Sequence, residues 1–299
     1  MGVTPVKERL RPPIVDGLFY PAKREALGAL VDQLIADSPV PRGASPAVIS
    51  PHAGYEYAGP VMAAAYRAVA MRPVRLAVIL GPVHRDAEDG VFLPESAAFS
   101  TPLGELPVDG EAVDSLCAAD AVFRRDDIPH LEEHCIEVQL PFLARLFPGL
   151  AIVPILVGSG GAPIAAALAA ALQSTFSARL ESTVFVMTAN MASYMTGKDV
   201  AAESAALEAL LAGCDWRGVI AASKRKQIST CGSTGIAALL SFLGNGCNAR
   251  ILARGSSRGE DGDESRIVQY AAISLDRAPS TGTRSAQTPY AAVSLDRSS

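Results

Sequence analysis

Two histidines, His52 and His84, each follow a short apolar run that is typical of a β-strand, over residues 47–50 and 76–80. In an open α/β sheet, residues just past the carboxyl ends of strands line the ligand crevice. We therefore expect neighbouring strands to deliver both imidazoles to one place, where they could share a metal ion.

Cys231 is the third candidate ligand. It directly precedes a helical apolar pattern, so the positive end of the helix dipole would favour its thiolate. One thiolate with two imidazoles suits zinc, iron or copper. A buried structural role is an equally good interpretation, because cysteine is among the most buried residue types.

His134 is the candidate for acid–base chemistry. It opens residues 134–147, whose apolar side chains have helical spacing. On such a helix Glu137 would lie one turn from His134 and could orient its imidazole for proton transfer. The same glutamate is also typical of the first turn of a helix, where it favours the helix dipole. The sequence leaves both interpretations open.

Composition excludes some classes of function. The chain has 299 residues, of which 49 % are hydrophobic, and a formal net charge of −5. It is long enough to bury a sizeable core. We expect no nucleic-acid partner, because no basic face is evident. The longest apolar runs are shorter than the ~20 residues that span a bilayer, and the N-terminus has no signal-peptide core. The short apolar runs predict no membrane partner. The five cysteines contain no CxxC pair, so we expect reduced thiols and a cytoplasmic location.

The apolar pattern predicts a single three-layer α/β domain with a central, mostly parallel sheet over residues 1–277. Continuous apolar runs at 76–80, 151–157 and 183–188 are typical of strands covered on both faces. Further strands are expected over residues 90–93, 249–253 and 267–275. Helices are expected over residues 23–37, 60–71, 110–118, 134–147, 163–176, 201–211, 216–224 and 231–243.

The C-terminus contains a repeat. Residues 270–277 recur as residues 290–297, and the only difference is Val293 in place of Ile273. The second copy could form another strand or exchange between protomers. It could also be a tandem duplication that leaves a mobile tail, since termini are poorly ordered unless tied down. We expect residues 278–299 to be a linker and a flexible duplicated segment.

Several motifs together resemble one known family. They are His52-Ala53-Gly54-Tyr55 with Tyr57 and Gly59, then residues 81–84, 101–104, 133–143 and 231–232. In this order they resemble the Memo family, whose bacterial members are often named AmmeMemoRadiSam system protein B. The resemblance covers about residues 11–275, and residues 17–21 and 270–272 also fit it.

The resemblance implies a fold similar to class III extradiol dioxygenases, which are non-haem iron enzymes that open catechol rings. In Memo-like proteins cysteine takes the place of the carboxylate ligand, so the implied ligands are His52, His84 and Cys231. The family's aspartate and histidine near residue 190 are replaced here by Asn190 and Ser193. Neither replacement transfers protons near neutral pH, so the usual ring-opening route is in doubt.

Three functions follow as hypotheses. The first is an oxidoreductase that uses Fe(II), with copper or zinc as alternatives, to bring O2 to a small organic substrate; His134, Tyr55 and Tyr194 would surround the metal. The second is a metal- or ligand-binding protein without catalysis, which the missing aspartate and histidine favour. The third is hydrolysis with Cys231 as nucleophile and a histidine as base. We rank it last, because two histidines converge where one would suffice.

Overall fold

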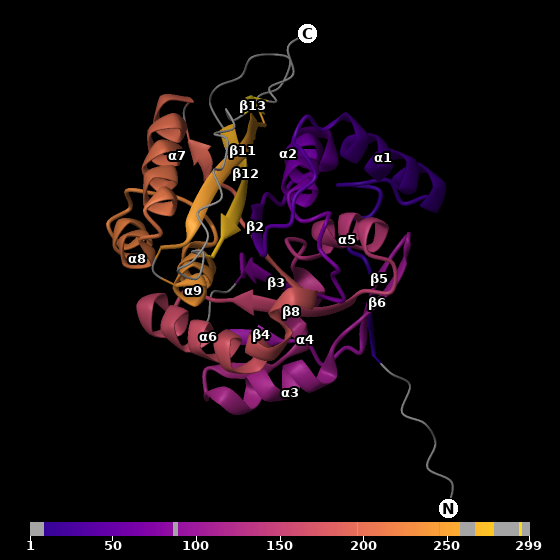
Figure 1. Ribbon diagram of the computed structural model, residues 1–299, viewed down its shortest axis with the longest axis horizontal. Coiled ribbons are helices and arrows are strands. Elements are labelled where there is room, and N and C mark those ends of the chain that lie inside the picture. The colour runs from indigo at the N-terminus through magenta and orange to yellow at the C-terminus, as the bar shows by residue number, and fades with distance from the viewer. Residues whose placement is uncertain are drawn as a thin grey trace, which may run out of the picture.

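The computed structural model describes residues 9–85, 89–195, 197–244, 246–257, 267–277 and 293–294. Its large sheet is built from β2 (Ala47–Ser50), β3 (Leu76–Pro82), β4 (Val91–Leu93), β7 (Phe123–Arg125), β8 (Ala151–Val157), β9 (Thr183–Thr188), β10 (Ala192–Met195), β11 (Asn248–Ser256), β12 (Ile267–Asp276) and β13 (Val293–Ser294). The strand order is β13-β11-β12-β2-β9-β3-β8-β4-β7, with β10 beside β12. Figure 1 shows this sheet between its helices and confirms the predicted α/β class.

The centre of the sheet is parallel and its flanks are not. Strands β2, β9, β3 and β8 run parallel, whereas β12 pairs antiparallel with β2 and β4 pairs antiparallel with β8. The parallel strands need crossover connections, but β11 and β12 can form a hairpin. The sheet is therefore mixed, with a parallel core where the sequence predicts continuous apolar strands.

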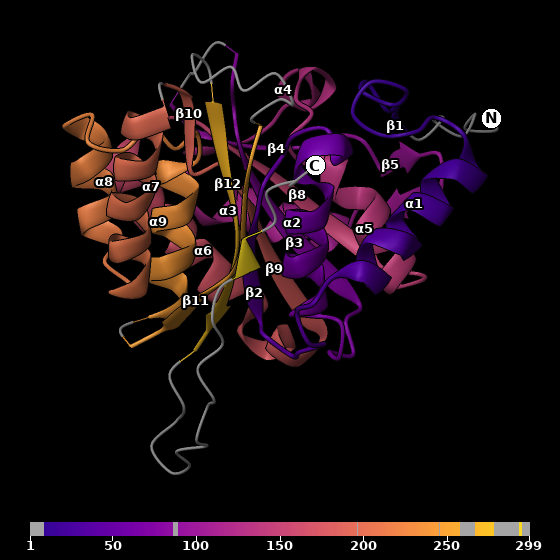
Figure 2. The same ribbon diagram turned by 90° about the horizontal axis from the view of Figure 1, so that it is seen from above.

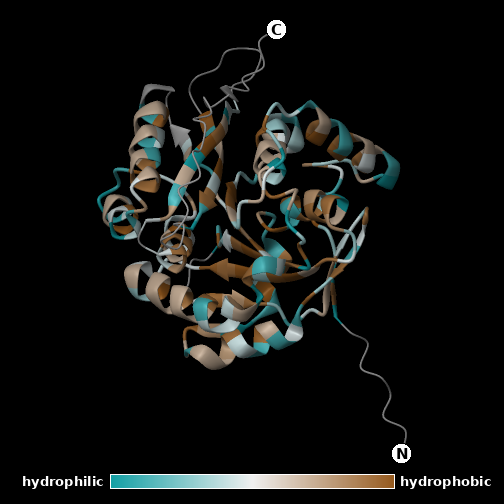
Figure 3. Ribbon diagram, viewed as in Figure 1, coloured by the Kyte–Doolittle hydropathy of each residue, from teal (hydrophilic) through white to brown (hydrophobic). Residues whose placement is uncertain are grey.

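Helices cover both faces of the sheet. One face carries α1 (Arg24–Asp37), α2 (Tyr55–Arg67) and α5 (Leu140–Leu146), and the other carries α3 (Gly110–Ala119), α6 (Gly161–Phe176), α7 (Gly197–Ala212), α8 (Trp216–Lys224) and α9 (Ser233–Leu243). Figure 2 shows the strands between these two layers. Alternate residues of β3 supply the two cores, with Val78 and Leu80 in one and Ala77 and Ile79 in the other. The central strands are accordingly apolar along their length (Figure 3).

Two predicted helices differ from the structure. Helix α2 begins at Tyr55 and carries Pro60 inside it, whereas the sequence predicts a start at Pro60. Residues 134–147 do not form one helix: α4 (Asp127–Glu132) ends before them, a 3-10 turn covers Glu137–Gln139, and α5 follows. Pro141 explains part of this division, because proline suits the first helical turn and cannot donate a backbone hydrogen bond further in.

A small second sheet ties the N-terminal arm to the domain. Strands β1 (Leu10–Arg11), β5 (Ala98–Thr101) and β6 (Gly104–Pro107) form it, with β1 parallel to β5. The sequence does not predict these strands, because each is only two to four residues long. Among the described residues, no helix combines the length and hydropathy that a membrane span needs.

Two cysteines form a disulfide. Cys214, in the turn after α7, is bonded to Cys247, which precedes β11, and their Cα atoms are 6.0 Å apart. The expectation that all five thiols are reduced is therefore wrong for this pair. Packing of α8 against α9 brings the two turns together, and spacing along the chain carries no sign of it. Cys117, Cys135 and Cys231 are free.

The two copies of the C-terminal repeat lie on opposite sides of one strand. The first copy forms most of β12 and pairs antiparallel with β11. Of the second copy, Val293 and Ser294 pair in parallel with Ala253 and Arg254 on the other side of β11. The remainder of residues 278–299, for which a flexible tail is expected, lies outside the described residues.

Candidate metal centre

The ends of parallel strands position the two candidate histidines. His52 follows β2 and His84 follows β3, and both lie at the carboxyl ends of their strands. Strand β9 lies between β2 and β3, so the expectation of neighbouring strands is wrong. The site survives this correction because β9 also ends at this edge and leads into Asn190.

Cys231 reaches the same edge from the connection between α8 and α9. It stands two residues before α9, whose first residue is Ser233. The hydroxyl of Thr230 donates to the carbonyl of Asn190 at 2.7 Å and ties this connection to the end of β9. A Cβ at Gly232 would crowd the Cβ of Ala189 and displace the terminal methyl group of Met187, so a glycine lets the turn approach the sheet closely.

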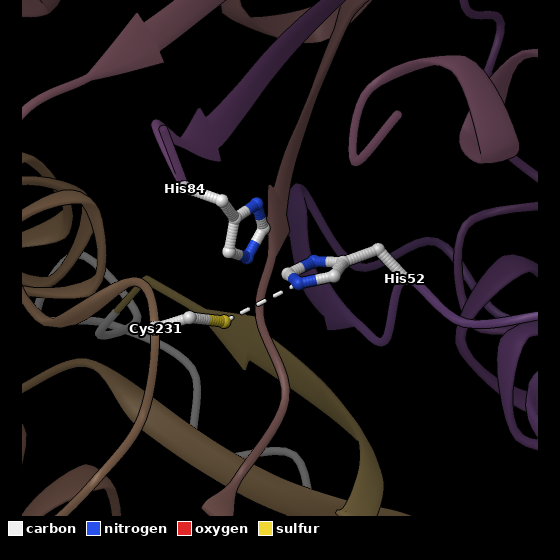
Figure 4. A group of neighbouring side chains, drawn as sticks. All are labelled: His52, His84 and Cys231. Atoms are coloured by element: carbon white, nitrogen blue, oxygen red, sulfur yellow. Dashed lines mark hydrogen bonds between the residues drawn. The ribbon is translucent and has the colours of Figure 1, made fainter. Parts of the chain in front are cut away.

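The three side chains point toward one another (Figure 4). One ligand atom from each of His52, His84 and Cys231 lies within 4.8 Å of the other two. Cys231 Sγ is 3.3 Å from His52 Nε2, and the ring centroids of His52 and His84 are 5.1 Å apart. Groups remote in sequence therefore converge on one small volume.

Glu133 orients His84. Its carboxylate accepts a hydrogen bond from the His84 backbone N–H and lies 2.8 Å from His84 Nδ1. A carboxylate only accepts, so the imidazole donates from Nδ1 and its Nε2 faces the other candidate ligands. The Glu133 side chain is 3 % exposed. Carboxylate–histidine pairs of this kind hold metal-ligating imidazoles in place.

A polar network of buried groups orients His52. Its Nδ1 lies 2.9 Å from Thr188 Oγ1, and Thr188 in turn accepts from Gln139 Nε2 at 3.0 Å. Gln139 also donates to the carbonyl of Pro51 and accepts from Tyr66. With Nδ1 engaged in this way, the Nε2 atom of His52 is directed at Cys231.

The pKa values of the two imidazoles are shifted in opposite directions. Burial, together with the nearby His84 and His134, lowers the pKa of His52 well below its usual value. Burial also lowers the pKa of His84, but hydrogen bonds to Cys231 and Glu133 outweigh it and raise this pKa to about 10. His52 is thus neutral near pH 7, while His84 carries a proton that a metal ion would displace.

His134 lies beside this group, in the segment between α4 and the 3-10 turn. Its ring stacks on His84 at 5.5 Å with an interplanar angle of 14°, and Phe19 packs edge-on against it at 4.9 Å. Burial and the charge of His84 lower its pKa. His84, Glu133 and His134 also form a compact group of donors. Stacked rings, however, direct their in-plane lone pairs side by side, which disfavours a shared ion.

The structure places the side chain of one of the two expected tyrosines, Tyr55. The Tyr55 hydroxyl donates to the carbonyl of Val138 at 2.7 Å, and the ring packs on Phe142 in the core. This hydroxyl already uses its only proton, and burial raises its pKa well above the usual value. The backbone of Tyr194 lies in β10, but its side chain lies outside the described part of the chain.

Glu137 stands in the first turn of the 3-10 helix, as one of the two interpretations expects, but its carboxylate binds the N-terminal arm and does not orient His134. Its buried carboxylate accepts from the Arg11 guanidinium, the backbone N–H groups of Ile14 and Val15, and the Tyr20 hydroxyl. It thereby fastens the N-terminal arm that carries Phe19 to His134. Because His134 is not helical, the one-turn spacing that suggested a contact with Glu137 does not apply.

Asn190 and Ser193 stand where the family resemblance places an aspartate and a histidine. Asn190 is buried, and its Oδ1 accepts from the His52 backbone N–H at 3.2 Å. Ser193 lies in β10, and its backbone N–H donates to Ser229. Asn190 therefore positions the turn that carries His52, a task for which an amide oxygen suffices.

Sequence reasoning missed Thr188 and Gln139, and it did not assign Glu133 its contact with His84. Glu133 could have been suspected, because it stands in the Glu133-His134 motif. Gln139 and Thr188 offer no such signal, since a single amide and a single hydroxyl in apolar segments are common.

Comparison with known proteins fits this arrangement. The model of the family described as Memo-like protein matches residues 11–274. This chain belongs to the Memo-like family. It is 30 % identical over 277 residues to a MEMO1 family protein of Thermotoga sp. (strain RQ2), covering 89 % of this chain and 99 % of that protein. A MEMO1 family protein of Ignicoccus hospitalis is 32 % identical over 281 residues, covering 88 % and 98 %.

Proposed function

We propose that this Memo-like protein binds one transition-metal ion through His52 Nε2, His84 Nε2 and Cys231 Sγ. The carrying observation is the convergence of these donors within 4.8 Å. Two imidazoles and a thiolate suit Fe(II), the metal we expect, and also copper and zinc. Three protein ligands leave coordination positions open for a small molecule, as in catalytic rather than structural sites.

The surroundings of the ligands support this proposal. The second ring nitrogen of each histidine is engaged, by Glu133 in one case and by Thr188 in the other. Engaging Nδ1 in both rings leaves both Nε2 atoms directed at Cys231, the orientation that metal-ligating histidines depend on. Hydrolysis by Cys231 would use one imidazole and leaves the convergence of the second unexplained.

We further propose an oxidoreductase that acts on a small organic substrate with O2. A bound Fe(II) ion would supply the redox and Lewis-acid chemistry. His134 would accept a proton beside the ligands, since its lowered pKa keeps it neutral near pH 7. Binding without catalysis is the second candidate, and the amide of Asn190 favours it because no second acid–base group stands at that position.

Metal analysis tests the binding site. The purified protein, loaded anaerobically with Fe(II) and desalted, should retain about one ion per chain by elemental analysis, consistent with one three-donor site. Cys231→Ser and His84→Ala should each lose most of it, because two donors remain. Cys117→Ser, which changes a free cysteine of α3, is the matched control. Equal retention by all variants would refute the proposal.

Oxygen consumption then separates the two candidates. We expect the Fe(II)-loaded protein to consume O2 in the presence of catechols or related aromatic compounds, and His134→Gln to slow turnover by about 10²-fold or more if it acts as a general base. Stoichiometric metal binding without turnover would instead establish the non-catalytic role.

A further inference from the structure

Because of the C-terminal repeat, the chain contains a second segment whose sequence nearly matches that of strand β12. Strand β12 occupies a demanding position between β11 and β2, and Ala271, Ala272, Ile273 and Leu275 are fully buried there. Residues 290–297 repeat all of these side chains except Ile273, which becomes the slightly smaller Val293. Replacing isoleucine by valine removes one methylene group and is among the core substitutions that destabilise a protein least.

We propose that residues 290–297 can replace residues 270–277 between β11 and β2 of the same molecule. The described part of the second copy lies beside the same partner: β11 pairs antiparallel with β12 on one side and in parallel with Val293–Ser294 on the other. The exchange therefore also requires the second copy to reverse its direction relative to β11. Replacing each residue by the one 20 positions later, the offset from Tyr270 to Tyr290, keeps every buried side chain of the strand on its own face of the sheet. A frame shift of one residue would instead turn the apolar side chains to the wrong face.

The residues before each copy explain why the first one holds the position. Ile267, Val268 and Gln269 pair with β10, and the Gln269 carbonyl accepts from Met191. Their counterparts are Gln287, Thr288 and Pro289. Proline cannot donate to a ladder, and glutamine cannot replace the buried Ile267. The exchanged state therefore gives up the pairing with β10, which follows Asn190 at the candidate metal centre.

The test uses four full-length chains: wild type, Ala272→Asp, Ala292→Asp and the double variant. An aspartate at position 272 lies in the core and expels the first copy. We expect Ala292→Asp to have the same denaturation midpoint as wild type. Ala272→Asp should stay folded and monomeric but have a lower midpoint. The double variant should be unfolded without denaturant. Circular dichroism and size-exclusion chromatography report these states without reference to metal.

Equal behaviour of Ala272→Asp and the double variant would overturn the proposal, whether both fold or both unfold. A rescued Ala272→Asp that is dimeric would also overturn it, because the second copy would then act between molecules. A further chain tests whether the sequence of the second copy or its access to the β12 position limits the exchange. It combines Ala272→Asp with Gln287→Ile, Thr288→Val, Pro289→Gln and Val293→Ile. This chain must fold, since its second copy matches residues 267–277 throughout.

Discussion

The candidate centre depends on single atoms whose direction is fixed by their neighbours. His84 and His52 each expose Nε2 because Glu133 and Thr188 engage Nδ1. Charge separates the two rings further: the carboxylate of Glu133 helps to raise the pKa of His84, while burial lowers that of His52. The electrostatic asymmetry arises from the burial of His52 on one side and from the hydrogen bonds of His84 to Cys231 and Glu133 on the other.

Glu133→Gln is the sharpest test at this scale. Its amide keeps the size of the side chain but loses the charge and one of the two acceptors that His84 uses. Loss of such a partner costs about 10–100-fold in metal affinity, which competition with a metal-binding dye would measure. Glu132→Gln changes the adjacent, exposed glutamate and should have no effect. Equal affinities of the two variants would show that Glu133 does not orient a ligand.

At the scale of elements, the parallel core supplies the site and the N-terminal arm closes it. Strands β2, β9 and β3 end at one edge and deliver His52, Asn190 and His84. The arm lies against this edge because Glu137, which is fully buried, binds Arg11 and Tyr20. This attachment holds Phe19 in the position where its ring packs on His134.

Breaking this attachment should destabilise the protein strongly. Glu137→Gln leaves the buried Arg11 guanidinium without its counter-charge, which typically costs about 3–5 kcal/mol. Tyr20→Phe removes one hydrogen bond to a charged acceptor and should cost about 1.5–3 kcal/mol. Urea denaturation measures both.

Asp32→Asn provides the contrast for these two variants. It breaks the half-exposed ion pair with Arg145, and exposed pairs contribute at most about 1 kcal/mol. If Glu137→Gln were as stable as Asp32→Asn, the arm would not depend on the buried carboxylate.

For the whole molecule, buried neutral histidines link stability to pH. His130 is enclosed and donates from Nε2 to the carbonyl of Phe92 at 3.1 Å. Burial lowers its pKa to about 4, although Asp127 and Asp126 oppose the shift and Arg11 assists it. In the unfolded chain the same imidazole has the ordinary histidine pKa of about 6.5.

Stability should therefore decrease on acidification. Between pH 6.5 and 4 the unfolded chain takes up a proton that the folded chain refuses, so the free energy of unfolding falls as pH falls through this window. His130 alone contributes roughly 3 kcal/mol to the change. His130→Gln keeps a donor for Phe92 and should flatten the dependence in denaturation series from pH 7 to pH 4. An unchanged slope would contradict this origin.

The sequence by itself determined the layers and three of the site residues. Continuous apolar runs predict strands β3, β8 and β9, because a strand covered on both faces buries the side chains on both sides and is therefore apolar along its length. His52, His84 and Cys231 were identifiable because each adjoins the end of a strongly patterned element. The family assignment rests on motifs that follow these ends.

Only the tertiary structure decided what surrounds those residues. Glu133, Thr188 and Gln139 contact the histidines across separations of 49 to 136 residues or through one another, and local patterns carry no information about such pairs. The same holds for Glu137, whose partners lie in the N-terminal arm. Periodicity records which face of an element is buried, whereas the choice of polar partner within a buried region depends on how distant elements pack.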